Sequence, residues 1–176
     1  MGTVDVPAFI DFVLEKTGLE TLSYIGHSES TTQMFMGLSL MPEYFKQKVN
    51  LYVALAPAVF IRGITDPATL KEAKHWKLLQ DVLEKVHLYN IIEPTPEMHQ
   101  AFAEVCTVAP SICKKFEDKG ELLPEVDNMS RELVMYSNFP SGSCYRLSIY
   151  YGQCVSNGGH FREFDYGSDA NMALYG

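Results

Sequence analysis

The chain has 176 residues, of which 47% are hydrophobic and 20% charged, and its formal net charge is -8 at pH 7. This length suits one compact domain, and the composition is that of a folded protein rather than a disordered one. The acidic balance argues against a nucleic-acid partner, which would need clustered Lys and Arg side chains.

The hydropathy pattern gives no sign of a membrane segment. No run of 18 apolar residues occurs, so we expect no membrane span. The first residues, MGTVDVPAF, lack the basic flank and the apolar block of a signal peptide, so none is expected in this chain.

Four cysteines are spread over the second half of the chain, without the paired C-x-x-C spacing of a zinc site. We therefore expect no metal, and we expect no other cofactor. Cys144 and Cys154 fall in one predicted helix, where ten residues span roughly 15 Å, so both should be free thiols. Cys106 and Cys113 flank Pro110, which should break a helix, so a disulfide between them is possible.

The first 60 residues alternate between helix and strand patterns. The segment DVPAFIDFVLEKTG predicts a helix with Asp5 as its cap, an apolar stripe of Phe9, Phe12 and Val13, and Gly18 as its end.

A short strand follows, in which Leu22, Tyr24 and Ile25 should be buried, and Gly26 closes it. Residues 29–40 predict a second helix, and the apolar run KVNLYVALAP predicts a second strand. Near-continuous apolar strands alternating with helices are typical of a parallel sheet covered on both faces, so the expected fold class is α/β.

From residue 61 onward the pattern becomes helical. Asp66 should cap a helix that begins at Pro67, and five later prolines divide residues 60–160 into short pieces. We expect this stretch to be one helical insertion without strands.

The turn between the first strand and the second helix carries the candidate chemistry, in the sequence Gly26-His27-Ser28-Glu29-Ser30. A nucleophile elbow places a serine at such a turn, where small residues two positions away on either side allow close packing. Ser28 is then the nucleophile, and the backbone N–H of Glu29 faces a developing oxyanion. The alternative is that Ser28 only caps the helix.

Several separate segments resemble the acid lipase family of α/β-hydrolases. YIGHSESTTQMF and VNLYVALAPA are similar to the family's segment around the nucleophile, while NMSRELVMYSNFPSGS and GGHFREFDYGSDANMALYG are similar to its cap region and the return to the sheet. The resemblance implies a partial α/β-hydrolase core at 1–60 with the elbow, a helical cap at 61–165, and the start of the return to the core at 166–176.

The resemblance also implies an activity, namely hydrolysis of neutral lipid esters such as triacylglycerols or cholesteryl esters, with possible contact to a lipid interface. The triad Asp and His should come from strands after the cap, so we expect both to lie outside this chain, which would then be inactive alone. His160 follows Gly158-Gly159, and the resemblance gives it no catalytic role. Asn128-Met129-Ser130 is a glycosylation sequon, which suits a secreted or lysosomal family member.

Two other functions stay open at this stage. Ser30 stands where the elbow motif usually has glycine, and this departure motivates a non-catalytic lipid-binding or interaction protein derived from a lipase. A different esterase on the same scaffold is the third possibility, because a fold does not determine the substrate.

Overall fold

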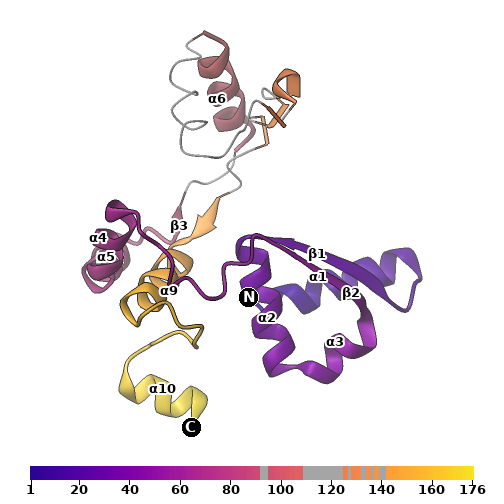
Figure 1. The fold of residues 1–176 in the computed structure, drawn as a ribbon, viewed down its shortest axis with the longest axis horizontal. Helices are drawn as coiled ribbons and strands as arrows, with labels where there is room; N and C mark the ends of the chain where they lie inside the picture. The colour runs from indigo at the N-terminus through magenta and orange to yellow at the C-terminus, as the bar shows by residue number, and fades with distance from the viewer. Residues whose placement is uncertain (92–94, 109–124, 127, 132–133, 136, 139–141) are drawn as a thin grey trace. The chain divides into compact units, whose positions relative to one another are not determined.

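A parallel two-stranded sheet lies at the centre of the N-terminal part of the computed structural model (Figure 1). The structure describes all residues except 92–94, 109–124, 127, 132–133, 136 and 139–141. Strands β1 (Leu22–His27) and β2 (Val49–Leu55) pair in register from Ser23 opposite Leu51 to His27 opposite Leu55. Two helices connect them, α2 (Glu29–Leu40) and α3 (Pro42–Lys48), which is the crossover that parallel strands require.

The chain divides into two compact units. The first comprises Met1–Lys74 and Tyr151–Gly176, and the second comprises His75–Tyr150. The expected domain limits at residues 60 and 165 stay a prediction.

Helix α1 (Asp5–Thr17) agrees with the sequence prediction in extent but not in the face that it buries. It ends at Gly18, whose φ of 69° is the left-handed conformation that terminates many helices. Val4 occupies the cap position, and Asp5 is already helical, so the prediction that Asp5 caps this helix was wrong. The Asp5 backbone N–H donates to Met1 O at 2.9 Å, so the hydrogen bonding of the first turn begins before Asp5.

The predicted apolar stripe of α1 was also wrong. Phe9 and Phe12 are exposed, at 71% and 57%, whereas Val6 and Ile10 are buried at 2%. Both faces of this helix carry apolar side chains, so helical spacing alone cannot decide which face the core covers.

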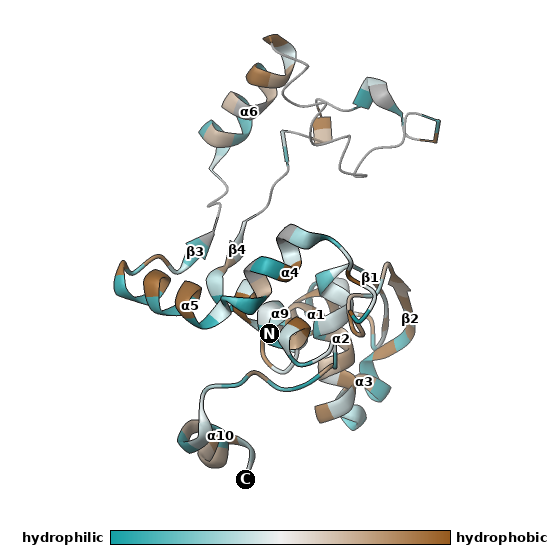
Figure 2. Ribbon diagram, turned by 60° about the vertical axis from the view of Figure 1, so that its left-hand side comes forward, coloured by the Kyte–Doolittle hydropathy of each residue, from teal (hydrophilic) through white to brown (hydrophobic). Residues whose placement is uncertain are grey.

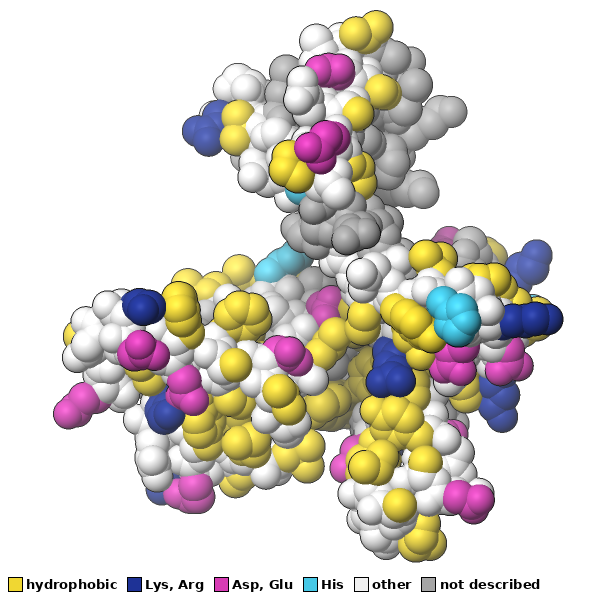
Figure 3. Space-filling model, turned by 180° about the vertical axis from the view of Figure 1, so that it is seen from behind, with side chains coloured by type: hydrophobic (Ala, Val, Ile, Leu, Met, Phe, Trp, Pro, Cys, Tyr) yellow, Lys and Arg dark blue, Asp and Glu magenta, His cyan; other side chains and the backbone are white. Residues whose placement is uncertain are grey.

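The core of the first unit lies between α1, α2 and α3. Val6, Ile10, Met34 and Phe45 form its buried cluster, and Tyr24 and Tyr52 of the strands pack against it among other side chains. The face of the strands that carries Ile25 and Leu51 is not covered by the described residues. Ile25 is 68% exposed and Leu51 55%, so the expectation that Ile25 is buried was wrong. Figure 3 shows many hydrophobic side chains on the surface of the part that carries α1, β1 and β2.

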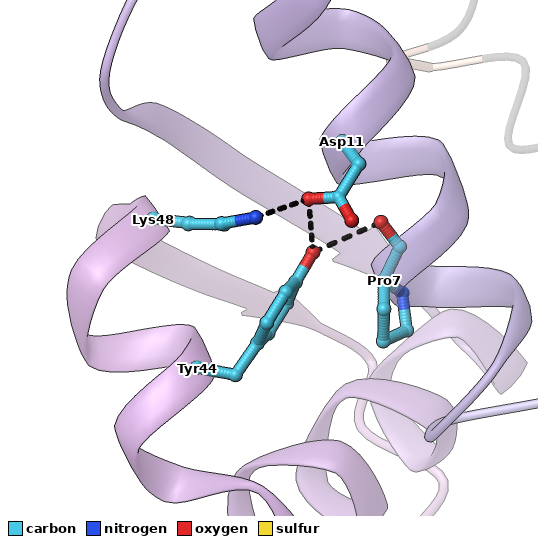
Figure 4. A network of polar contacts seen from close by, with 4 residues as sticks. All are labelled: Pro7, Asp11, Tyr44 and Lys48. Carbon is cyan, nitrogen blue, oxygen red and sulfur yellow. Dashed lines mark hydrogen bonds and ion pairs between the residues drawn. The ribbon is translucent and has the colours of Figure 1, made fainter.

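A polar network joins α1 to α3 (Figure 4). The Tyr44 hydroxyl donates to Asp11 Oδ1 at 2.7 Å and also lies 2.9 Å from Pro7 O, while Lys48 Nζ pairs with the same Asp11 oxygen. The hydrogen bonds from Lys48 and Tyr44 hold the pKa of Asp11 below its ordinary value. Burial, reinforced by Asp11, raises the pKa of Tyr44, so its hydroxyl stays protonated and donates.

The remaining elements of the first unit are helical. Helix α4 (Pro67–Lys74) is capped by Asp66, whose Oδ2 accepts the Thr69 N–H at 2.7 Å, as predicted. Helix α9 (Tyr145–Ser156) begins in the second unit and continues into the first, and helix α10 (Ser168–Tyr175) follows.

The second unit contains α5 (Trp76–Lys85), α6 (Pro96–Val108) and the short 3-10 helix η2 (Met129–Arg131). Helix α5 has one apolar and one polar face (Figure 2), and its apolar side chains Leu78 and Val82 are 62% and 49% exposed. Strands β3 (Asn90–Ile91) and β4 (Ser143–Cys144) pair antiparallel, so the expected absence of strands between residues 60 and 160 was wrong. Two residues per strand are too few to show a period in the sequence.

Candidate active site

Ser28 lies at the turn between β1 and α2, at the carboxyl end of the parallel pair. Its φ of 54° and ψ of -116° are strained for a residue with a side chain. The Ser28 N–H donates to Leu55 O at 3.0 Å, which extends the β1–β2 hydrogen bonding up to the turn. The strand therefore delivers the serine to the sheet edge, and its side chain is exposed there.

The alternative interpretation of Ser28 as a simple helix cap does not agree with the geometry. Ser28 occupies the cap position of α2, but its side chain makes no capping hydrogen bond. The Thr31 N–H donates to the Ser28 carbonyl oxygen instead, at 3.0 Å. The hydroxyl is thus left available for other chemistry.

Gly26 and Ser30 close the turn by a tight contact. A Cβ on Gly26 would lie 3.1 Å from Ser30 Oγ and 3.1 Å from Tyr24 Cε1, so a larger residue here would require these neighbours to shift by a few tenths of an ångström. Ser30 Oγ accepts the His27 N–H at 2.6 Å and donates to His27 O at 2.8 Å. The serine that replaces the usual glycine therefore fits the turn and makes hydrogen bonds across it.

Glu29 is the first residue of α2, so its backbone N–H belongs to the first turn, where helical N–H groups have no partner within the helix. Its side chain points along the helix and accepts a hydrogen bond from Gln33 Nε2 at 2.6 Å. The backbone N–H at a helix N-terminus can stabilise an anion that develops next to Ser28.

No histidine or carboxylate side chain is hydrogen-bonded to Ser28 within the part of the chain that the structure describes. His27 is exposed and its backbone N–H is bound by Ser30. His160 is placed against Arg62, whose guanidinium nitrogen lies 2.8 Å from Nδ1. Of the candidate site residues that the structure describes, it therefore brings together the five of the elbow, residues 26–30.

The structure describes three of the four cysteines. Neither Cys144 nor Cys154 takes part in a disulfide, as expected. The prediction that one helix holds both was wrong, because Cys144 lies in β4 and Cys154 in α9. Cys106 is buried and disulfide-bonded. Cys113 lies outside the described residues, so the pairing of Cys106 with Cys113 stays a prediction.

The sequon residue Asn128 directly precedes η2 and is exposed. Its Oδ1 accepts hydrogen bonds from the N–H and the hydroxyl of Ser130, at 3.2 and 2.6 Å. This turn presents the asparagine at the surface, where glycosylation requires it.

A pocket of about 270 Å³ lies away from the elbow, between α9 and the segment that leads into α10. None of the five elbow residues lines it. Among the described residues no group of three His, Cys, Asp or Glu side chains is arranged to hold a metal ion, and no described helix is long and apolar enough to cross a membrane.

The curated relatives of the chain are lipases. It is 34% identical over 177 residues to lipase member K of Homo sapiens and 32% identical over 174 residues to lipase member M of Mus musculus. It is 31% identical over 182 residues to the lysosomal acid lipase/cholesteryl ester hydrolase of Macaca fascicularis. The chain belongs to the acid lipase family.

These acid lipase relatives match 96–98% of the chain, and the chain spans 40–43% of their own length. No protein-family model matches the chain. Acid lipases have an α/β-hydrolase fold, and the β1–α2–α3–β2 unit with its serine turn is a part of such a fold. The lipase resemblance expected from the separate motifs is thereby confirmed.

One feature of the acid lipase segment was missed at the level of sequence. Thr31 and Thr32, in the first turn of α2, are buried at 0% and 3% exposure and bind residues distant in the chain. The sequence carries no signal for this feature, because the burial of the two hydroxyl groups, and hence their need for partners, depends on the tertiary fold.

Proposed function

We propose that Ser28 is the nucleophile of a carboxylic ester hydrolase that acts on neutral lipids. The observation that supports this most directly is the backbone of Ser28, which is strained at a strand-to-helix turn and makes no capping bond. Strain of this kind persists only where the surrounding structure maintains it, and it occurs preferentially at functional sites. A helix cap would not need it.

The chemistry follows from the geometry of the elbow. Ser28 Oγ attacks the ester carbonyl carbon while a histidine takes its proton, and the carbonyl oxygen becomes an oxyanion. The Glu29 N–H stabilises that oxyanion. The intermediate collapses with loss of the alcohol, to which the histidine returns the proton, and water then hydrolyses the acyl-serine. As the family resemblance implies, we expect the histidine that takes the proton and the aspartate that orients it to lie outside these 176 residues.

The names of the relatives support the substrate class. One of them is a lysosomal acid lipase/cholesteryl ester hydrolase, so we propose cholesteryl esters or triacylglycerols as substrates and lipid degradation as the process. From the same name we propose a lysosomal or secreted location for the full-length protein.

The cap belongs to the same proposal. The presence of helices α4, α5 and α6 within residues 61–165 supports the proposal of a helical cap there. Exposed Asn128 then carries a glycan on this segment, and the disulfide of Cys106 is made with Cys113.

The proposal is tested by active-site labelling of the full-length gene product with a fluorophosphonate, which reacts with activated serines. We expect labelling on the peptide that contains Ser28 and hydrolysis of a long-chain cholesteryl ester, and both should be lost in Ser28→Ala. The matched control is Ser39→Ala, an exposed serine of the same helix whose hydroxyl donates to Phe35 O, and it should label normally.

An unlabelled wild-type protein that is folded would exclude the serine hydrolase and favour the non-catalytic lipid-binding alternative. Persistent labelling of Ser28→Ala would place the nucleophile elsewhere.

A further inference from the structure

Two adjacent threonines at the start of α2 have buried hydroxyl groups. Thr31 is 0% and Thr32 is 3% exposed, although both follow the exposed Ser28 within four residues. A buried hydroxyl without a partner is destabilising, so the partners of these side chains show what the fold uses them for.

The Thr31 hydroxyl connects the elbow to the loop after β2. It donates its single hydrogen to the Ser28 carbonyl oxygen and accepts the Ala58 N–H at 3.1 Å. The same Ser28 carbonyl also accepts the Thr31 N–H at 3.0 Å. The orientation of the Ser28–Glu29 peptide is therefore held from one buried residue, Thr31.

The Thr32 hydroxyl continues the connection to α9. It lies 2.8 Å from Ala58 O and 3.0 Å from the Tyr151 hydroxyl. A carbonyl oxygen can only accept, so Thr32 donates to Ala58 and must accept from Tyr151. Burial raises the pKa of Tyr151, so this phenol is protonated and able to donate.

The two threonines thus hold both polar groups of one residue, Ala58, which lies just beyond β2. Thr31 binds its N–H and Thr32 binds its carbonyl oxygen. Ala56, two residues earlier, has a φ of 44°, so the loop leaves β2 through a strained residue of its own. The strained backbone at Ser28 and the strained backbone at Ala56 are thus connected through the hydrogen bonds of Thr31 and Thr32.

We propose that Thr31, Thr32, Ala58 and Tyr151 form a threonine clamp that positions the nucleophile. The clamp fixes the Ser28 carbonyl and thereby the strained φ and ψ that direct its hydroxyl and the neighbouring Glu29 N–H. It makes Thr31, Thr32 and Tyr151 positioning residues for the reaction. The inference rests on the proposed function of Ser28.

The test compares fluorophosphonate labelling rates of the full-length gene product. Thr31→Val keeps the shape of the side chain and removes its hydroxyl, whereas Thr31→Ser retains the hydroxyl. Tyr151→Phe removes the hydroxyl that donates to Thr32. Thr17→Val is the matched control, because the exposed Thr17 hydroxyl contacts nearby backbone groups, the Val13 and Leu14 carbonyl oxygens and the Leu19 N–H, far from the elbow in sequence.

The first-order rate at saturating probe, the half-saturating probe concentration and the final labelled fraction are measured separately. We expect Thr31→Val to lower the saturating rate roughly tenfold to hundredfold, because small displacements of a reacting group have effects of this size. Tyr151→Phe should cause a smaller drop. Thr31→Ser and Thr17→Val should label at the wild-type rate, and the half-saturating concentration should stay constant throughout.

A purely structural role gives a different result. If removal of the hydroxyl only unfolds part of the protein, the final labelled fraction falls while the labelled molecules react at the wild-type rate, and the clamp is refuted. If Thr31→Val does not fold, Tyr151→Phe decides: a full endpoint with a lower rate supports the clamp, and an unchanged rate overturns it. Failure of the wild type to label at Ser28 overturns the proposed function itself and this inference with it.

Discussion

Replacement of Gly26 by alanine tests how tightly the elbow is built. The new Cβ would lie 3.1 Å from both Ser30 Oγ and Tyr24 Cε1 and 3.4 Å from the Ser30 carbonyl carbon. The Tyr24 ring is held by an edge-to-face contact with Tyr52, whose centroid lies 5.8 Å away, so it cannot move freely. Gly26 has no positive φ, and crowding is the relevant cost.

The magnitude follows from two opposing effects. Overpacking of a well-packed site costs about 1–3 kcal/mol, and the loss of glycine's freedom in the unfolded chain returns about 0.4–1 kcal/mol. We expect Gly26→Ala to lower the free energy of unfolding by about 0.5–2 kcal/mol. In a Ser30→Gly background the nearest polar contact is gone, so the same substitution should cost less.

Urea denaturation of the four proteins of this cycle, followed by circular dichroism, gives the coupling between the two positions. Contacting residues typically couple by about 0.5–3 kcal/mol, and we expect a favourable coupling within that range. A Gly26→Ala penalty that is equal in both backgrounds would refute the crowding argument. Fluorophosphonate labelling should slow in Gly26→Ala and recover partly in the double variant.

Three further outcomes follow from the structure. Phe45→Ala should cost about 3–5 kcal/mol of unfolding free energy in urea denaturation, because the 1%-exposed ring fills the core cluster; a loss under 1 kcal/mol would contradict the described core. The lowered pKa of Asp11 contributes stability above the ordinary carboxyl value of 3.8 that is lost as pH falls through the lower folded-state pKa. Asp11→Asn should therefore flatten the acid limb of the melting temperature against pH, and an unchanged limb would exclude a role for the Lys48 and Tyr44 bonds. Asn128→Gln in a secretory host should abolish the mobility shift caused by glycosidase treatment, and a persisting shift would place the glycan elsewhere.

The elbow could be located from the sequence because all of its determinants are local. Gly26, Ser28 and Ser30 fall within five residues, between an apolar β-branched run and a helical segment, and the structure has a strand and a helix there. The stop signal at Gly18 and the cap at Asp66 are local in the same way, and both are found. From the sequence alone, serine at position 30 looks unfavourable, because the elbow motif usually has glycine there. Only the two hydrogen bonds between Ser30 and His27 show that serine fits the turn.

The burial of α1 could not be obtained in this way. Phe9 and Phe12 have the spacing of a core face, but the core selects Val6 and Ile10 because α2 and α3 pack on that side. Ile25 in β1 and Leu51 in β2 are exposed for a related reason: none of the described residues covers their side of the strands. Hydrophobic periodicity identifies a face that can be buried, and the packing partners decide whether it is.

The sequence by itself determined the family, the helix–strand order around Ser28 and the helix end signals at Gly18 and Asp66, because these depend on residues a few positions apart. Only the tertiary structure decided how the serine is held. The Thr32 and Tyr151 hydroxyls meet across 119 residues of sequence, and the Ala58 backbone meets Thr31 across 27. Such contacts depend on how separate elements pack, and no local pattern encodes a hydrogen bond whose two partners are brought together only by the fold.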